Sequence, residues 1–453
     1  MPVSPARAAA FDILLKVERE HSYASDLLHS SRFAKLSSAD HGLVTELVMG
    51  VLRWKSLLDE RLSCVSAQKL DRLDDEVLAA LRLAAYQLQV LSRVPARAAI
   101  FESVELVKAA RKRSASSFVN AVLRKLAPAA SAGPEPQASG KDAFANINRA
   151  SDPLTLARNA AHPEWLVTRW AHRYGFETTR RICAHNQKPP VTTIHVHDNP
   201  SVEELARGGV ELGPGHLLRA ARTVLAGDVT RTRTYREGRI SIQGEASLLI
   251  ALLVGRGQRI LDCCAAPGGK TALIARRNPS ATVIASDLHP HRARLLRSFT
   301  RSPNVGIVAA DARQLPFSVM FDRILADVPC SGTGTLARNP EIKWRLRPQD
   351  MADLQSQQIA ILTSVLTRLA PDGRLVYSTC SLEPEENEAV VEAALAGSSE
   401  FSIANCRKEL ERLRQSGELC ADDVESLLDG PYLRTIPGEH PCDGFFATII
   451  ERQ

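Results

Sequence analysis

Paired cysteines, long apolar runs and internal repeats are all missing from this 453-residue chain. Its nine cysteines are an odd number without C-x-x-C spacing, so we expect neither a disulfide scaffold nor a zinc site. No uncharged apolar run approaches the roughly 18 residues that a membrane span needs. Charged residues, among them Asp12 and Lys16, interrupt the N-terminal apolar stretch, which argues against a signal-peptide core. These absences predict a cytoplasmic protein in a reducing environment, with no metal and no membrane contact.

Apolar material, by contrast, is plentiful. Hydrophobic residues make up 44% of the chain and charged residues 24%, which is ordinary for a folded protein, and the length predicts two or three domains. The formal net charge is +6. Residues 1–130 hold most of this excess, with 19 Lys and Arg against 14 Asp and Glu. A mildly basic chain is compatible with a polyanionic partner but does not identify one.

The pattern of apolar residues divides the chain into four stretches. Residues 1–128 repeat apolar positions at helical spacing, which predicts an all-helical bundle. Residues 129–157 begin with a run rich in Ala, Pro, Gly and Ser and are expected to be a linker. Residues 158–240 are expected to form a small mixed α/β segment. Residues 241–453 alternate short apolar strands with helices, which predicts a doubly wound α/β domain with ligands at the carboxyl ends of its parallel strands. The expected strands are 259–264, 282–286, 306–310, 323–326, 374–378 and 445–450.

A basic triplet, Arg111-Lys112-Arg113, stands out in the helical stretch. Such clusters usually form a solvated face, and they can also form a phosphate-binding surface. The residues alone leave both interpretations open.

A glycine turn joins the first strand of the α/β domain to a helix. Small residues let the backbone approach a ligand, and the first turn of a helix offers free N–H groups. The ending Gly269-Lys270-Thr271 suggests a P-loop, but that motif needs a glycine where Cys264 stands. We therefore reject nucleoside-triphosphate binding. The turn consists of Cys264, Ala265, Ala266, Pro267, Gly268, Gly269 and Lys270.

Two carboxylates follow the next two strands of this domain. Asp287 ends the second strand and can accept hydrogen bonds from both hydroxyls of a ribose. Asp311 ends the third and can face the edge of an adenine. Together with the glycine turn they predict a nucleoside cofactor, and a nicotinamide cofactor would fit these residues equally well.

Two cysteines follow later strands, Cys330 in Asp327-Val328-Pro329-Cys330 and Cys380 in Ser378-Thr379-Cys380-Ser381. A thiolate that adds to carbon 6 of a cytosine makes carbon 5 nucleophilic enough to attack a sulfonium methyl group. That chemistry also needs an acid near the ring and a group that helps to release the product. Asp327, Cys330 and Cys380 are the residue types required. The alternative, that both cysteines are buried packing residues, is weakened by their polar turns and by the adjoining cofactor loop.

These segments closely resemble the 16S ribosomal RNA cytosine-5 methyltransferases of the Sun family, within the wider nucleolar-protein/Sun family. The resemblance implies S-adenosylmethionine as the cofactor, held by the loop from Cys264 to Lys270 and by Asp287, Asp311 and Asp327. It further implies that Cys380 is the nucleophile and that Cys330 assists product release. The segments that carry it are Cys264–Thr271, Asp327–Gly334, Asn339–Trp344, Tyr377–Ser381, Pro384–Glu388 and Asp443–Phe446.

The helical stretch is similar to the RNA-binding NusB antitermination protein, through Arg97–Glu105 and Phe118–Arg124. This resemblance implies small-subunit ribosomal RNA as the partner of a protein that we expect to be monomeric. The chain departs from the family where Gly244 replaces a usual Asp, and where His195 and His197 replace an Arg-x-Asn pair. These departures leave open how the segment 158–240 contacts RNA.

Two other functions fit the same sequence. One is the same reaction on transfer RNA or another RNA. The other is a non-catalytic RNA-binding antitermination factor that keeps an inert methyltransferase fold. The presence of Cys330, Cys380 and Asp287 together argues against the second.

Overall fold

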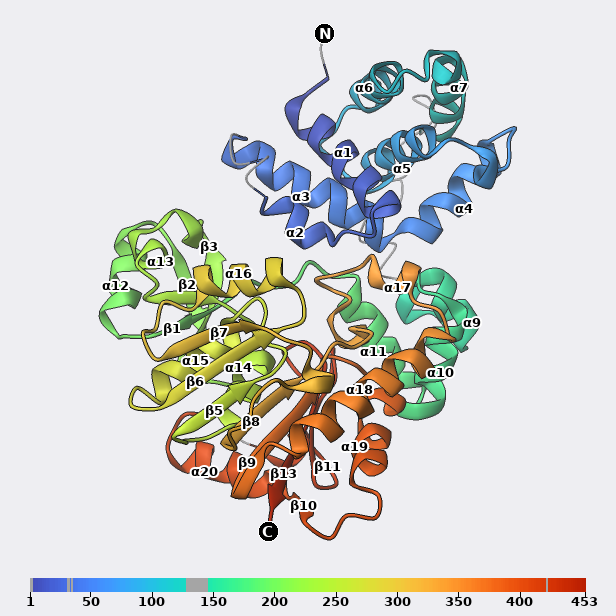
Figure 1. The fold of residues 1–453 in the computed structure, drawn as a ribbon. Coiled ribbons are helices and arrows are strands. Elements are labelled where there is room, and N and C mark those ends of the chain that lie inside the picture. Colours follow the sequence, from blue (N-terminus) through green and yellow to red (C-terminus); the bar gives the residue numbers. More distant parts are fainter. Residues whose placement is uncertain (1–2, 31–32, 34–35, 128–145, 421–422) are drawn as a thin grey trace. The chain divides into compact units, whose positions relative to one another are not determined.

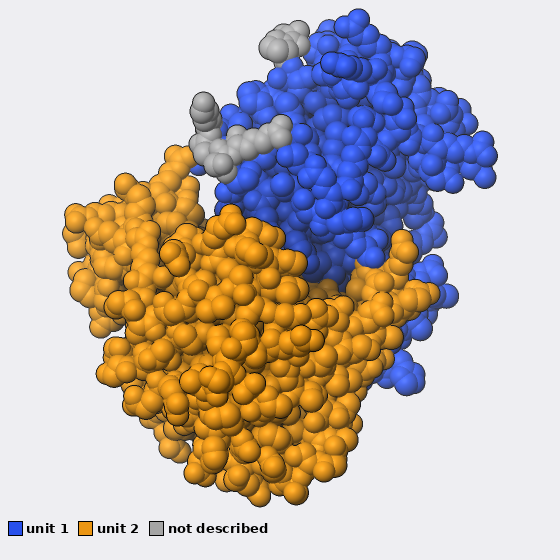
Figure 2. Space-filling model, in the orientation of Figure 1, with its two compact units in different colours: residues 1–189, 336–345 blue, residues 190–335, 346–453 orange. Residues whose placement is uncertain are grey.

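The computed structural model describes residues 3–30, 33, 36–127, 146–420 and 423–453. Two compact units make up the chain (Figure 2). The first, here called the helical unit, comprises residues 1–189 and 336–345, and the second, the sheet unit, comprises residues 190–335 and 346–453. Most of the linker predicted at 129–157 falls on residues 128–145, which lie outside the described residues. The domain boundaries drawn from the sequence stay predictions.

Helices make up the regular structure of the helical unit (Figure 1), which confirms the predicted N-terminal bundle. Local signals explain where some of them begin: Pro5 occupies the first turn of α1, and the Ser37 hydroxyl accepts the Asp40 amide at the start of α3. The elements are α1 (Pro5–Arg19), α2 (Ala24–Leu28), α3 (Ser38–Arg53), α4 (Lys55–Val65), α5 (Asp75–Val90), α6 (Ala96–Ala109), α7 (Ser116–Leu126), α9 (Pro153–Asn159), α10 (Glu164–Tyr174), α11 (Phe176–Asn186) and α17 (Ile342–Arg345).

Helix α9 starts inside the range predicted as linker. The carboxylate of Asp152 accepts the amides of Leu154 and Thr155 at 3.0 Å each, and Pro153 occupies the first turn. This cap stabilises a helix in a stretch whose composition alone predicts none.

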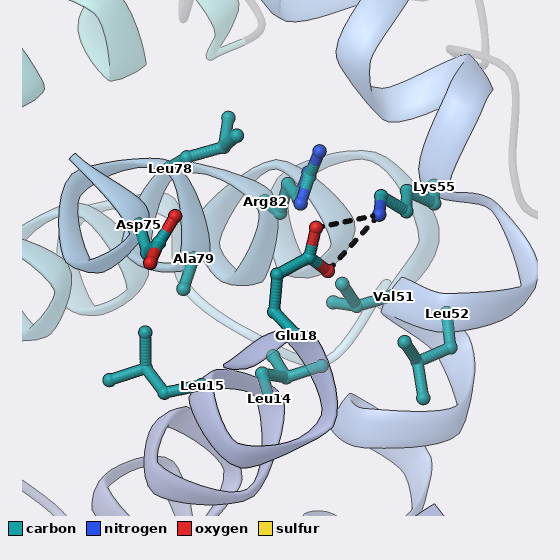
Figure 3. Close-up of a pocket in the computed structure, with 10 residues that line it drawn as sticks. All are labelled: Leu14, Leu15, Glu18, Val51, Leu52, Lys55, Asp75, Leu78, Ala79 and Arg82. Atoms are coloured by element: carbon teal, nitrogen blue, oxygen red, sulfur yellow. Dashed lines mark hydrogen bonds and ion pairs between the residues drawn. The ribbon is translucent and has the colours of Figure 1, made fainter. Parts of the chain in front are cut away.

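A small hollow lies among helices α1, α3, α4 and α5 (Figure 3). Lys55 and Glu18 form an ion pair across it at 3.1 Å, and burial lowers the pKa of Lys55. Its other lining residues are mostly apolar, among them Leu14, Val51 and Leu78. None of the residues singled out in the sequence lies there, so the hollow is a packing feature of the bundle.

The sheet unit begins with a small antiparallel sheet whose strand order is β2-β3-β1-β4. Ile194, Leu205, Val210 and Ile240 form its buried core. The elements are β1 (Thr193–Val196), α12 (Pro200–Arg207), β2 (Glu211–Pro214), β3 (Ala221–Ala226), α13 (Arg233–Arg236) and β4 (Ile240–Ile242).

The large sheet that follows has the order β11-β12-β13-β9-β8-β5-β6-β7, with β10 paired to β13 (Figure 1). Strands β5 to β9 pair in parallel, which confirms the predicted doubly wound domain. The elements are α14 (Glu245–Leu253), β5 (Arg259–Asp262), α15 (Gly269–Arg277), β6 (Thr282–Asp287), α16 (Pro290–Phe299), β7 (Val305–Ala309), β8 (Phe321–Asp327), α18 (Asp350–Leu366), β9 (Leu369–Thr379), α19 (Glu388–Leu395), β10 (Phe401–Ala404), α20 (Cys406–Gln415), β11 (Leu428–Asp429), β12 (Tyr432–Thr435) and β13 (Phe445–Arg452).

The last strand runs against the direction expected for it. Strand β13 is antiparallel to β9, with Phe446 opposite Thr379, and antiparallel to β12 as well. A short connection from β12 to β13 reverses the chain, whereas a parallel neighbour would need a long crossover. This arrangement brings the start of β13 to the carboxyl end of β9, beside Cys380. Within the described part of the chain, no helix is both long and apolar enough to cross a membrane.

Candidate active site

The two cysteines of the sequence prediction lie together in the sheet unit. Cys380 directly follows β9, Cys330 follows β8, and their sulfur atoms are 3.4 Å apart. Both are free thiols and half-buried. A hydrogen bond with Cys380, together with burial and the charge of Cys380, raises the pKa of Cys330 well above its ordinary value. Cys330 therefore holds its proton and can donate it toward the sulfur of Cys380.

A buried carboxylate joins the two loops that carry these cysteines. Glu386 accepts hydrogen bonds from the Ser331 amide at 2.8 Å, from the Ser331 hydroxyl and from the Ser381 hydroxyl at 2.5 Å. Gln358 donates to it at 2.9 Å and also to the carbonyl of Pro329. Because Ser331 and Ser381 each directly follow one of the cysteines, Glu386 fixes the spacing of the two thiols.

Two glycines allow the backbone to close around this pair. The Gly334 amide donates to the Cys380 carbonyl at 2.9 Å, and the Gly444 amide donates to the Gly334 carbonyl at 2.8 Å. A Cβ atom on Gly334 would lie 2.2 Å from the oxygen of Gly444. No side chain fits there, which gives a physical reason for glycine in both motifs.

Asp327 ends β8 opposite Ser378 of β9. Its carboxylate accepts the Ser378 hydroxyl at 2.7 Å and pairs with the Lys270 ammonium at 2.7 Å. Burial lowers the pKa of Lys270, but the charges of Asp327, Cys380 and Asp262 outweigh it and leave that pKa raised. A positive charge therefore lies beside the cysteine pair. Lys270, part of the predicted cofactor turn, thus contacts the predicted catalytic carboxylate.

A second carboxylate at this edge was not singled out in the sequence. Asp262 ends β5, is 1% exposed and accepts the Thr271 hydroxyl at 2.6 Å. Burial, with a contribution from the charge of Asp327, raises its pKa to about 7. Its other oxygen, Oδ1, is buried without a hydrogen-bond partner among the described residues. In the sequence, Asp262 ends a predicted strand directly before the glycine turn, and this position could have indicated a functional carboxylate.

The glycine turn has the backbone that close approach to a ligand requires. Gly268 has a φ of 115°, and a Cβ atom there would lie 3.0 Å from Leu296. A Cβ on Gly269 would lie 2.9 Å from the Gln243 side chain. Ala265 is held by its amide, which donates to the Ser286 carbonyl at 2.8 Å. Cys264 is partly exposed and contacts the sulfur of the buried Cys263 at 3.9 Å.

The two carboxylates predicted to hold a nucleoside differ in their environments. Asp287 ends β6, is 4% exposed and accepts the His289 amide at 3.2 Å. Asp311 lies just beyond β7, where it caps a short helical turn and pairs with Arg313 at 2.7 Å. The hydrogen bond with Arg313 lowers its pKa. Asp287 also faces an arginine, but Arg292 is 3.7 Å away, so its carboxylate is the less tightly held of the two and the better placed to accept ribose hydroxyls.

The residues that depart from the family pattern lie in the small sheet and just after it. The rings of His195, on β1, and His197, just after it, are 4.8 Å apart. Burial and the charge of Arg276 lower their pKa values to about 4 and about 3. Gly244 precedes α14 as its N-cap. Among the described residues, no group of His, Cys, Asp or Glu side chains is arranged to hold a metal ion.

Comparison with known proteins identifies the chain's relatives. A family model described as 16S rRNA methyltransferase RsmB/F matches residues 249–451, a NusB family model matches residues 4–128, and a ferredoxin-like domain model of RsmF/B-like methyltransferases matches residues 162–208. A probable ribosomal RNA small subunit methyltransferase B from Bacillus subtilis is 35% identical over 470 residues and covers 100% of both chains. The chain belongs to the RsmB/F family of 16S rRNA methyltransferases.

Other members and solved structures agree with this family. The ribosomal RNA small subunit methyltransferase B of Vibrio cholerae is 30% identical over 460 residues, which cover 99% of this chain and 97% of that protein. The fold is also that of PH0851, with a TM-score of 0.79 and 23% identity over 100% of both chains. A methyltransferase homologue from Pyrococcus horikoshii aligns with a TM-score of 0.55 and 25% identity, covering 67% of this chain and 100% of that one. Both resemblances expected from the sequence, to the Sun family and to NusB, are therefore confirmed.

Proposed function

We propose that this protein methylates carbon 5 of a cytosine in small-subunit ribosomal RNA, with S-adenosylmethionine as the methyl donor and a covalent cysteine–cytosine adduct as the intermediate. The 3.4 Å separation of the Cys330 and Cys380 sulfur atoms carries this proposal. Two thiols on adjoining strand ends, next to a carboxylate–lysine pair, match what this reaction needs. Family membership supplies the class of substrate.

The residues present fit the cofactor. The turn is too closely packed for side chains at positions 268 and 269, where a Cβ would meet Leu296 and Gln243, and the buried Asp262 Oδ1 has no hydrogen-bond partner among the described residues. The cofactor would be held by the turn from Cys264 to Lys270, by Asp287 and Asp311, and at its reactive end by Asp327. When bound, it supplies an electrophilic methyl group on a sulfonium. The same relationship supports a cytoplasmic, RNA-bound role.

Cys380 begins the reaction. Its thiolate forms a bond to carbon 6 of the cytosine, and the ring electrons move toward carbon 5 and N3. N3 takes a proton from solvent, and Asp327 accepts a hydrogen bond from it and stabilises its charge. This proton returns to solvent when the ring is restored. Carbon 5 then takes the methyl group, while the electron pair of the broken carbon–sulfur bond stays with the donor sulfur.

Cys330 acts at the end. Its pKa is raised chiefly by the hydrogen bond with Cys380. When Cys380 is bound to the cytosine as a thioether, it no longer forms this thiol–thiol hydrogen bond. Cys330 then loses its proton more readily, at the step that requires a base. The Cys330 thiolate removes the proton from carbon 5. The carbon 5–carbon 6 double bond reforms, and Cys380 leaves as a thiolate.

Replacement of each cysteine tests this division of roles. With the methyl group of S-adenosylmethionine labelled, Cys330→Ala should methylate once and stall as a labelled protein–RNA band that survives denaturing electrophoresis. Cys380→Ala should give neither methylation nor a band. A band from Cys380→Ala alone would reverse the roles, and no band or methylation from any form, wild type included, would favour an inert RNA-binding protein. Bisulfite sequencing of ribosomal and transfer RNA from a deletion strain separates the two RNA substrates.

A further inference from the structure

Helix α16 carries an unusual concentration of unpaired positive charge. No Asp or Glu occurs from Leu288 to Ala310. Arg294 and Arg297 are exposed on α16 and have no ion-pair or hydrogen-bond partner among the described residues. Some other exposed arginines of the sheet unit do pair with carboxylates, as Arg233 does with Glu237, and a third cation of α16, Arg292, lies 3.7 Å from Asp287.

The positive charge continues onto the small sheet. The guanidinium of Arg301, just after α16, donates to the carbonyl of Arg236, the last residue of α13, at 3.0 Å, so the chain that follows α16 reaches α13. Arg236 itself donates to the backbone carbonyls of Thr232 and Arg231 rather than to a carboxylate. Four exposed cations thus lie on α13, on α16 and just after α16, and none of them has an ion-pair partner among the described residues.

Exposed apolar side chains flank these cations on the side of the glycine turn. Leu288, Leu295 and Phe299 are 50%, 46% and 51% exposed. Leu295 and Phe299 lie four residues apart on one face of α16, and Leu288 precedes the helix. A Cβ atom on Gly268 would lie 3.3 Å from the Cβ of Phe299, and Asp287 immediately precedes Leu288. The apolar stripe therefore borders the edge of the sheet that carries the candidate active site.

We propose that this surface, here called the α16 patch (Arg236, Arg294, Arg297, Arg301 and Phe299), binds a single-stranded segment of the RNA substrate next to the target nucleotide. Unpaired arginines bind phosphates, and an exposed aromatic ring offers a surface on which an unpaired base stacks. Surfaces that bind folded proteins are usually apolar or carry charges of both signs. The charged residues of this patch are all positive, which favours a nucleic acid as the partner. The inference rests on the proposed function, because it assigns a binding surface to that same reaction.

Matched pairs of charge changes test the patch in the full-length protein. Arg294→Gln with Arg297→Gln removes two patch cations. Lys408→Gln with Arg414→Gln removes two exposed cations of α20, which likewise have no ion-pair partner among the described residues and lie at another part of the sheet unit (Figure 1). Binding of transcribed small-subunit ribosomal RNA is measured over a series of salt concentrations. The patch variant should lose roughly tenfold in affinity, and its log–log salt slope should be smaller by about 1.4, at about 0.7 for each lost contact. The α20 variant should match wild type.

Phe299→Ala gives an independent result. Affinity for the same RNA should fall roughly tenfold with the salt slope unchanged, because stacking releases no counterions. Unchanged binding of S-adenosylhomocysteine shows that the adjoining glycine turn is intact. If the double Arg variant binds the RNA with wild-type affinity and a wild-type salt slope, the proposal is wrong. It is also wrong if this variant binds the RNA normally but loses methylation only on assembling particles, because that result indicates a protein partner. Wild-type protein that binds this RNA but never methylates it would instead refute the proposed function.

Discussion

Trp344 donates its indole hydrogen to the carbonyl oxygen of Leu52 at 2.6 Å, although 292 positions separate the two residues. Next to it, the buried Lys343 donates to the Arg53 carbonyl at 2.9 Å, and Arg53 donates to the Ala337 carbonyl at 3.0 Å. The chain therefore leaves the sheet unit after residue 335, becomes part of the helical unit up to residue 345, and returns. The segment Asn339–Trp344, one of those that carry the resemblance to the methyltransferases, is therefore part of the packing of the helical unit.

The bond from Trp344 should contribute measurably to the stability of the helical unit. Trp344→Phe keeps the aromatic ring but leaves the Leu52 carbonyl without this donor, so the free energy of unfolding should fall by about 1 kcal/mol. Denaturant unfolding of the full chain measures it. Arg347→Ala, an exposed residue three positions on, is the control and should change stability by less than about 0.5 kcal/mol. Equal stability of both variants would show that the bond contributes nothing.

The Glu386 carboxylate should position the two cysteines rather than take part in the chemistry. In Glu386→Gln one oxygen becomes an NH₂ group that faces donors, so the serine hydrogen bonds are lost and the thiols shift. Since misplacement by about 1 Å can cost about 100-fold in rate, kcat should fall about 10- to 100-fold while the KM for S-adenosylmethionine stays unchanged. Glu392→Gln, on the exposed face of α19, is the matched control. A change in KM alone would contradict a positioning role.

The general architecture could be predicted from sequence because strand ends of a parallel sheet meet at one edge. That rule predicted that Asp327, Cys330 and Cys380 would lie together. It could not predict that Lys270 pairs with Asp327, because that choice depends on side-chain direction within the turn. Nor could it find Glu386, whose partner Ser331 is 55 residues away and meets it only through the folded loops.

Two further differences have local causes. The direction of β13 depends on the short connection from β12, which hydrophobic alternation does not encode. The charge on Asp311 is already engaged by Arg313, two residues on, so its position after a strand is a weaker indication of a ligand than that of Asp287.

Asp287 should contribute more to cofactor binding than Asp311. Asp287→Ala should weaken S-adenosylmethionine binding by roughly 1.5–3 kcal/mol, the scale of a hydrogen bond to a charged group. Asp311→Ala should have a smaller effect, because its carboxylate is more exposed and pairs with Arg313 at 2.7 Å, closer than the 3.7 Å between Asp287 and Arg292. Calorimetry compares both with Asp353→Ala, an exposed control on α18. Unchanged affinity in Asp287→Ala would remove Asp287 from the cofactor site.

The pKa of Asp262, raised to about 7 by burial, predicts a dependence of stability on pH. The ordinary value is 3.8, so between about pH 4 and 7 the folded state holds a proton that the unfolded chain releases. The stability due to this carboxyl is therefore complete below about pH 4 and is lost as the pH rises through about 7. The difference between the folded and unfolded pKa values corresponds to at most about 4 kcal/mol of unfolding free energy.

Asp262→Asn isolates this effect, because an amide keeps an oxygen for the Thr271 hydroxyl but cannot ionise. Denaturant unfolding without cofactor should give wild type a stability close to that of the variant at about pH 4, and a lower one at pH 8. Asp353→Asn, which removes an exposed charge from α18, should run parallel to wild type across the same range. If the stability of wild type and of Asp262→Asn instead changes in parallel with pH, Asp262 is ionised in the folded protein across this range. Its Oδ1 must then have a hydrogen-bond partner such as a bound water.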